Sequence, residues 1–187
     1  MLDDRFHRDP DEAPDRKTML GTAQLEWLKS SLKASRATFK VIAGGGTLLV
    51  DEGKETWSRF GSERDDFLKW MFSEGIEGVF FIAGDWHIGV LNRLNRPGFP
   101  YPLYELLSSN LAVKIIPRDR VELAEGTANN QWVSKRYTGY NFGSLRFTGD
   151  RGDRSVTLQI VDDTGGVQAE LTLHETDLRA GGSEKKS

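Results

Sequence analysis

The sequence predicts a mixed α/β fold that becomes mostly β in its second half. Three observations lead to this prediction: two helical repeats of apolar residues before residue 75, a wholly apolar strand at 79–83, and a series of short strand candidates after residue 87. The chain has 187 residues, of which 37% are hydrophobic. Both values are typical of a globular protein of about one domain, at roughly 150 residues per domain.

The composition excludes several classes of protein. The net charge of −3 gives no basic surface for nucleic acid or for an anionic membrane. The sequence contains no cysteine, which excludes disulfides, thiolate metal sites and cysteine nucleophiles. The apolar stretch at 79–83 is far shorter than the roughly 20 residues that a membrane helix needs.

The first part of the chain is predicted to be a loop, a helix and a strand. Residues 1–16 are charged and contain two prolines, so they read as a loop whose first five residues could end a strand. Leucines at helical spacing predict a helix over 22–35, with Thr22 or the preceding glycine as its cap. A short β-type run follows at 39–43, and three consecutive glycines end it.

A second helix and a buried strand follow. A long loop over 44–62 is rich in glycine and acidic residues, and a loop of this length inside a compact domain is usually functional or poorly ordered. Ser62 is predicted to cap a helix that runs to residue 73, with acidic residues in its first turn. The strand at 79–83 is apolar on both faces, which places it inside a covered sheet.

The second half of the chain is predicted to consist of short strands. The last two are separated by an Asp-Asp-Thr-Gly-Gly turn at 162–166, which indicates a hairpin. We expect this hairpin to join the earlier strands in one sheet core, with both helices on one face. The tail at 180–187 is expected to be disordered. The strand candidates are 88–94, 103–107, 111–116, 143–147, 156–161 and 167–173.

The clearest chemical feature is Gly84-Asp85-Trp86-His87, directly after the buried strand. Functional groups gather at the carboxyl ends of strands in covered α/β sheets. A carboxylate with an imidazole suits iron, zinc or manganese, and suits calcium or magnesium only if more oxygen ligands join. The alternative is a surface loop with a capping aspartate and an incidental histidine.

A second feature lies at the N-terminus, where Asp3 stands near Arg5 and Arg8. A carboxylate beside arginines can orient a guanidinium toward a phosphate, although a solvated charge cluster is the simpler interpretation. The acidic pairs at 51–52 and 162–163 are expected to be solvated. No P-loop follows the three glycines, and no Gly-x-Ser-x-Gly nucleophile elbow is present.

Seven segments in order resemble the C-terminal half of the PhoD-like alkaline phosphatase/phosphodiesterase family of metallophosphoesterases. The resemblance as a whole runs from residue 2 to about residue 173, nearly the whole chain. The segments are Leu2-Asp-Asp-Arg-Phe-His-Arg8, Met19-Leu-Gly-x-x-Gln24-x-x-Trp27-Leu28, 39–42, Trp57-Ser-Arg-Phe60-x-x-Glu63-Arg64, 84–87, 101–109 and Asn141-Phe-Gly143.

The resemblance implies a fold and a reaction. The fold would be the C-terminal half of a layered αββα sandwich, with residues 1–179 as part of a phosphatase domain. The reaction would be hydrolysis of phosphate mono- or diesters by a metal cluster, typically iron with calcium. A phosphate ester would be the substrate, and the family's location outside the cytoplasm, in the periplasm or secreted, would apply.

The resemblance also assigns roles to five residues. Asp85 corresponds to a late metal ligand, and His87 to a second ligand or a substrate contact that could help to protonate the leaving group. Arg5 falls where the family places an arginine near the phosphate, and Asp3 supports that segment. Trp57 lies in a loop that could rim the pocket and contact substrate.

The family's earlier motifs, which supply most of the metal ligands, have no counterpart in this sequence. We therefore expect a fragment, or a chain started at an internal methionine, whose missing N-terminal half carries those ligands and any signal peptide. Two alternatives remain: a catalytically inactive binding or partner module of the same fold, and an unrelated α/β hydrolase with a mononuclear site.

Overall fold

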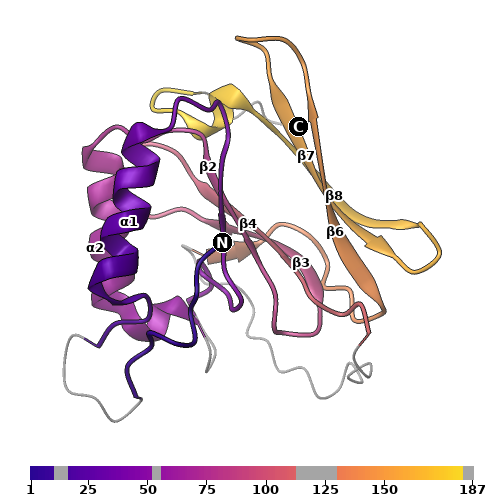
Figure 1. Cartoon of the computed structure of the whole chain (residues 1–187). Coiled ribbons are helices and arrows are strands. Elements are labelled where there is room, and N and C mark those ends of the chain that lie inside the picture. Colours follow the sequence, from indigo (N-terminus) through magenta and orange to yellow (C-terminus); the bar gives the residue numbers. More distant parts are fainter. Residues whose placement is uncertain (11–16, 52–55, 113–129, 183–187) are drawn as a thin grey trace.

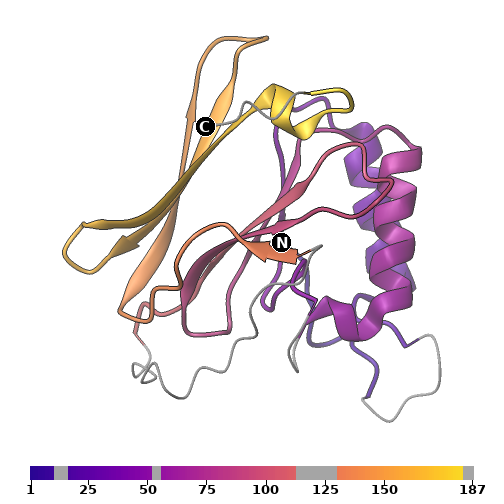
Figure 2. The same cartoon turned by 180° about the vertical axis from the view of Figure 1, so that it is seen from behind.

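The computed structural model describes residues 1–10, 17–51, 56–112 and 130–182, and these form three layers. Two helices lie side by side against one face of a five-stranded sheet, and a three-stranded sheet lies on the other side (Figures 1 and 2). The predicted α/β fold with a mostly β second half is confirmed. The helices are α1 (Gly21–Ala34) and α2 (Gly61–Ser73), with short 3-10 turns η1 (Trp57–Phe60) and η3 (Glu175–Leu178).

The first sheet is mixed. Its strands β1, β2 and β4 run parallel, whereas β3 runs antiparallel to both of its neighbours. Strand β2 lies between β1 and β4 and is almost entirely buried, as its apolar sequence predicts. The strands, in spatial order, are β1 (Lys40–Ala43), β2 (Val79–Ala83), β4 (Leu103–Ser108), β3 (Gly89–Leu94) and β5 (Asn130–Trp132).

The late hairpin does not join this sheet, contrary to the sequence-based expectation. It belongs to a separate antiparallel sheet, β6 (Asn141–Thr148), β7 (Ser155–Asp162) and β8 (Val167–His174). Strand β7 alternates strictly over most of its length, and its side chains Val156, Leu158 and Ile160 are fully buried toward the core. A strand with one apolar face packs face to face on another sheet, whereas an added central strand would be apolar on both faces.

Both predicted helix caps are wrong. Helix α1 begins at Gly21 after Leu20, and Thr22 lies within its first turn without capping it. Helix α2 follows η1 without a break, because Gly61 already has helical backbone angles. Since the chain is helical before residue 62, Ser62 has no cap position to fill.

Three further predictions concern the N-terminus, a strand candidate and the C-terminal tail. The first residues form no strand, although the Leu2 N–H donates to the Ala43 carbonyl at the end of β1, 2.7 Å away. Most of the strand candidate at 111–116 lies outside the described residues, and so do residues 183–187 of the predicted tail.

Candidate functional site

The predicted N-terminal and strand-end segments meet at the carboxyl ends of β1 and β2. The Arg5 guanidinium lies 3.2 Å from an Asp85 carboxylate oxygen, measured from Nη2 to Oδ2. Both side chains remain in contact with solvent, with 50% of Arg5 and 34% of Asp85 exposed. Two candidate residues 80 positions apart in the sequence thus share one edge of the sheet.

Asp3 shapes the turn that carries Arg5. Its Oδ1 accepts hydrogen bonds from the backbone N–H groups of Phe6 at 2.8 Å and Arg5 at 3.0 Å. These two bonds lower the pKa of the Asp3 carboxyl below its usual value. The Asp3 backbone is held in turn by Gln24 of α1, whose side-chain amide bonds both its N–H and its carbonyl at 2.7 Å.

Asp4 contributes a contact that the sequence did not predict. Its side chain is buried, and its Oδ2 accepts from the Gly46 N–H in the loop after β1. A Cβ on Gly45 would lie only 2.7 Å from Asp4 Oδ1, so the loop needs glycine at that position. In the sequence, the three consecutive glycines indicate this contact, because residues without side chains let the segment that bears Arg5 approach the end of β1.

The turn after β2 has an unusual backbone. Asp85 and His87 have φ angles of 75° and 55°, in the left-handed region that residues other than glycine seldom occupy. The Gly84 N–H donates to the Gly45 carbonyl at 3.1 Å, and the His87 N–H donates to the Ser109 hydroxyl at 2.9 Å. Such conformations persist where surrounding contacts impose them, often at functional sites.

Trp57 is part of the core and exposes no surface to a ligand. Its side chain is completely buried, and its indole N–H donates to Glu63 at 2.8 Å. The same carboxylate accepts from the backbone N–H groups of Met19 at 2.8 Å and Leu20 at 3.2 Å. Glu63 thus binds the chain before α1 to α2 and to Trp57. The predicted role of Trp57 at the rim of a pocket finds no support.

Two acidic residues that were expected to be solvated have structural partners instead. Asp51 Oδ1 accepts from the guanidinium groups of Arg64 and Arg96, each at 2.8 Å. Asp162 accepts from Thr164 and from the Gly166 N–H within the hairpin turn, and these bonds lower its pKa. Both side chains thus have structural roles in the described part of the chain.

The described residues do not by themselves fit the metal cluster that the resemblance implies. Among them, no group of three or more His, Cys, Asp or Glu side chains is arranged to hold a metal ion. Asp85 is already paired with Arg5, and a multinuclear centre needs several more oxygen or nitrogen ligands. Iron and calcium therefore remain a prediction.

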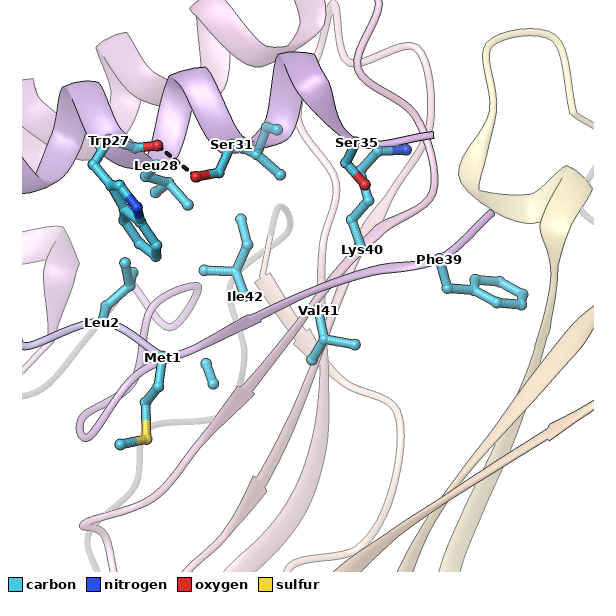
Figure 3. Close-up of a pocket in the computed structure, with 12 residues that line it drawn as sticks. Met1, Leu2, Trp27, Leu28, Ser31, Ser35, Phe39, Lys40, Val41 and Ile42 are labelled. Atoms are coloured by element: carbon cyan, nitrogen blue, oxygen red, sulfur yellow. Dashed lines mark hydrogen bonds between the residues drawn. The ribbon is translucent and has the colours of Figure 1, made fainter. Parts of the chain in front are cut away.

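A groove of about 310 Å³ lies between α1 and β1, and neither Arg5 nor Asp85 lines it. Figure 3 shows Leu2 and Ile42 pointing toward the helix that carries Trp27, whereas Val41 points away. Trp27 is 54% exposed and Val41 is 41% exposed. Strand β1 is the edge strand of the described sheet. The apolar lining of the groove therefore adjoins the open edge of this strand.

None of the helices in the described ranges combines the length and the hydropathy needed to cross a bilayer.

Comparison with known proteins agrees with this arrangement. The solved structure of PhoD has the same fold, with a TM-score of 0.66 at 16% sequence identity. The match covers 98% of this chain and 41% of that chain, so this chain spans less than half of the solved protein. No curated protein matches the sequence. The family model of PhoD-like phosphatases matches residues 1–158, and the chain therefore belongs to the PhoD-like phosphatase family.

Proposed function

We propose that this chain is the C-terminal half of a phosphoesterase that hydrolyses phosphate mono- or diesters. The observation that carries the proposal is the Arg5–Asp85 contact at the carboxyl edge of the parallel strands. A half-exposed guanidinium at this edge offers a planar pair of donors to the oxygens of a phosphoryl group. Membership of the PhoD-like phosphatase family supports the same class of substrate.

The remaining residues hold Arg5 and complete the site. Asp85 orients the guanidinium, while Asp3 and Asp4 fix the turn that presents it. Arg5 stabilises negative charge on the phosphoryl oxygens as the bond to the leaving group breaks. His87, two residues after Asp85 in the same turn, either contacts the ester or delivers a proton to the leaving oxygen.

The metal cluster in this proposal requires ligands from residues other than those described. Asp85 and His87 alone fall short of a complete ligand set. We propose that the other ligands lie in the part of a PhoD-like protein that this chain does not span, and that the cluster contains iron and calcium. We also propose that the complete protein lies outside the cytoplasm, as its resemblance to the family implies.

The test uses the longer protein encoded with the DNA upstream of Met1, assayed on p-nitrophenyl phosphate and bis-p-nitrophenyl phosphate. Replacing Arg5 by alanine should lower kcat/KM by about 100-fold or more, the usual loss when a donor to the reacting group is removed. Replacing the exposed Arg59 by alanine is the matched control and should change kcat/KM by less than about twofold.

Asp85→Asn and His87→Ala complete the set. Both should lower activity strongly while leaving the unfolding transition of the protein in place. Wild-type activity in all three site variants would contradict the assignment of this edge as the active site.

A second candidate function is a catalytically inactive module that binds a partner through the groove in Figure 3. The exposed Trp27 and the open edge of β1 favour this candidate, because exposed apolar surfaces beside a strand edge are typical of binding sites. The same assay separates the two functions. A folded longer protein without activity on either ester would favour the module.

A further inference from the structure

Ser109, the first residue after β4, holds the backbone of His87. Its hydroxyl accepts the His87 N–H at 2.9 Å. The left-handed φ of 55° takes His87 out of the extended conformation of the neighbouring strands. A side-chain acceptor at this point therefore stabilises a conformation that the backbone does not favour by itself.

Gly84 packs between Ser109 and the loop after β1. A Cβ on Gly84 would lie 3.4 Å from the Ser109 Cβ and 3.3 Å from the Gly45 carbonyl oxygen. The loop after β1, the turn after β2 and the residue after β4 are thus packed against one another at backbone level. A small hydroxyl side chain fits this space.

Both sequence neighbours of Ser109 are hydrogen-bonded to the second sheet or to the segment before it. The preceding Ser108 hydroxyl donates to Asn141 Oδ1 at 2.7 Å. The following Asn110 is fully buried, and its side-chain amide donates to the carbonyls of Thr138 at 3.0 Å and Gly139 at 3.1 Å. Ser109 therefore has little freedom to move away from His87.

We propose that Ser109 is a positioning residue: its hydroxyl sets the left-handed conformation of His87 and so aims the imidazole at the edge where Arg5 meets Asp85. The inference rests on the proposed function, because that function is what gives His87 a catalytic role. Its first consequence, the conformation of His87, can be measured without any activity.

The first experiment measures amide hydrogen exchange by NMR on the 187-residue chain. Ser109→Ala should lower the protection of the His87 amide roughly tenfold, the effect of losing one hydrogen bond. Ser109→Thr, which keeps the hydroxyl, should restore it. Ser109→Cys, with a weaker acceptor of similar size, provides a second variant if the alanine variant does not fold.

Ser134→Ala is the matched control, because the Ser134 hydroxyl accepts the Leu91 N–H at 3.0 Å in the same way but elsewhere in the sheet. It should lower protection at Leu91 and leave His87 unchanged. Unchanged protection of His87 in both Ser109→Ala and Ser109→Cys would overturn the inference.

The second experiment measures kinetics in the longer protein. Ser109→Ala should lower kcat about tenfold with little change in KM, and Ser109→Thr should recover it, whereas Ser134→Ala should match the wild type. Loss of His87 protection without loss of kcat would overturn the catalytic part of the inference. An inactive wild type would refute the proposed function, and the exchange data would still decide whether Ser109 sets His87.

Discussion

At the scale of single residues, buried carboxylates hold loops in place by accepting backbone N–H groups. One carboxylate can accept hydrogen bonds from several backbone N–H groups of a loop, which no strand or helix pairs. Among the described residues, three carboxylates that are nearly or fully buried join segments distant in the sequence in this way. The pairs are Asp4 with Gly46, Glu63 with Met19 and Leu20, and Glu105 with Leu48 and Leu49.

Glu105 should make the stability of the chain depend on pH. Burial raises its pKa to about 7 from an ordinary 4.5, although the N–H groups of Leu48 and Leu49 and the charge of Arg64 act in the opposite direction. The native state therefore binds more protons than the unfolded state between these two values. The stabilisation from Glu105 is complete below pH 4.5 and is lost as the pH rises through 7.

Glu105→Gln removes this titration and keeps an oxygen that can accept from Leu48 and Leu49. Urea unfolding at acidic and at mildly alkaline pH should show the variant gaining up to about 3 kcal/mol relative to the wild type between the two conditions. Glu26→Gln, at an exposed position, controls for the change in net charge. A pH-independent difference between wild type and Glu105→Gln would rule out titration of Glu105 in this range.

At the scale of elements, a charged network joins α2 to the segment that leaves β3. Arg64 of α2 is 3% exposed at its side chain and donates to Asp51, which also accepts from Arg96 after β3. Arg96 donates in addition to Asp65 of α2 at 2.8 Å. The network fixes Asp51 against the helix layer, so the segment after β1 is held both at Gly46 and at Asp51.

Asp51→Ala should destabilise the protein by about 2–3 kcal/mol, because among the described residues it leaves the buried Arg64 only the longer contact to Asp65 at 3.3 Å as an ion pair. The matched control is Asp66→Ala in the same helix. Asp66 is 77% exposed and 3.7 Å from Lys69, so its loss should cost less than about 0.5 kcal/mol. Equal losses of unfolding free energy in the two variants would contradict this role for Asp51.

The sequence predicted the elements better than their ends and their assembly. The alternation in 156–161 and the continuous apolar run at 79–83 gave strands with the correct faces buried. The cap at Ser62 was wrong because η1 extends the helical backbone, which depends on contacts of Trp57 in the core. Which sheet a strand joins depends on the other strands present, and local patterns do not contain that information.

Parts of the candidate site could be predicted from the position of a residue after a strand or from the family resemblance, whereas contacts between distant segments could not. Asp85 follows a buried strand, and Arg5 was assigned by resemblance to a family. Asp4 and Ser109 were missed, because each acts on a backbone N–H in a distant segment. Such contacts leave no periodic pattern around either partner, and only the glycines at 44–46 indicated a close approach.

At the scale of the whole molecule, glycines set the distance between the two sheets. Gly89 of β3 and Gly143 of β6 both lie where the sheets face each other. A Cβ on Gly89 would be 2.6 Å from Ile160 Cγ2, and one on Gly143 would be 2.9 Å from Leu106 Cδ2. A side chain at either position would require the contacted side chain of the facing sheet to shift. The cost is larger at Gly89, which is buried against the branched Ile160.

Gly89→Ala should therefore destabilise the chain by about 1–3 kcal/mol, the usual cost of overfilling a core. Gly61→Ala is the control: a Cβ there would meet nothing within 4 Å and the backbone is helical, so the variant should be unchanged or up to about 1 kcal/mol more stable. Chemical unfolding of both variants tests this, and equal stabilities would show that the layers can separate without cost.

The left-handed backbone of Asp85 and His87 has a consequence for directed evolution. Glycine adopts such angles freely, whereas each of these residues costs on the order of 1–3 kcal/mol in that conformation. A library selected for heat resistance alone would therefore enrich glycine at both positions. Selection for stability and selection for the proposed activity would act against each other at this turn, and a thermostable descendant would lose these two candidate site residues first.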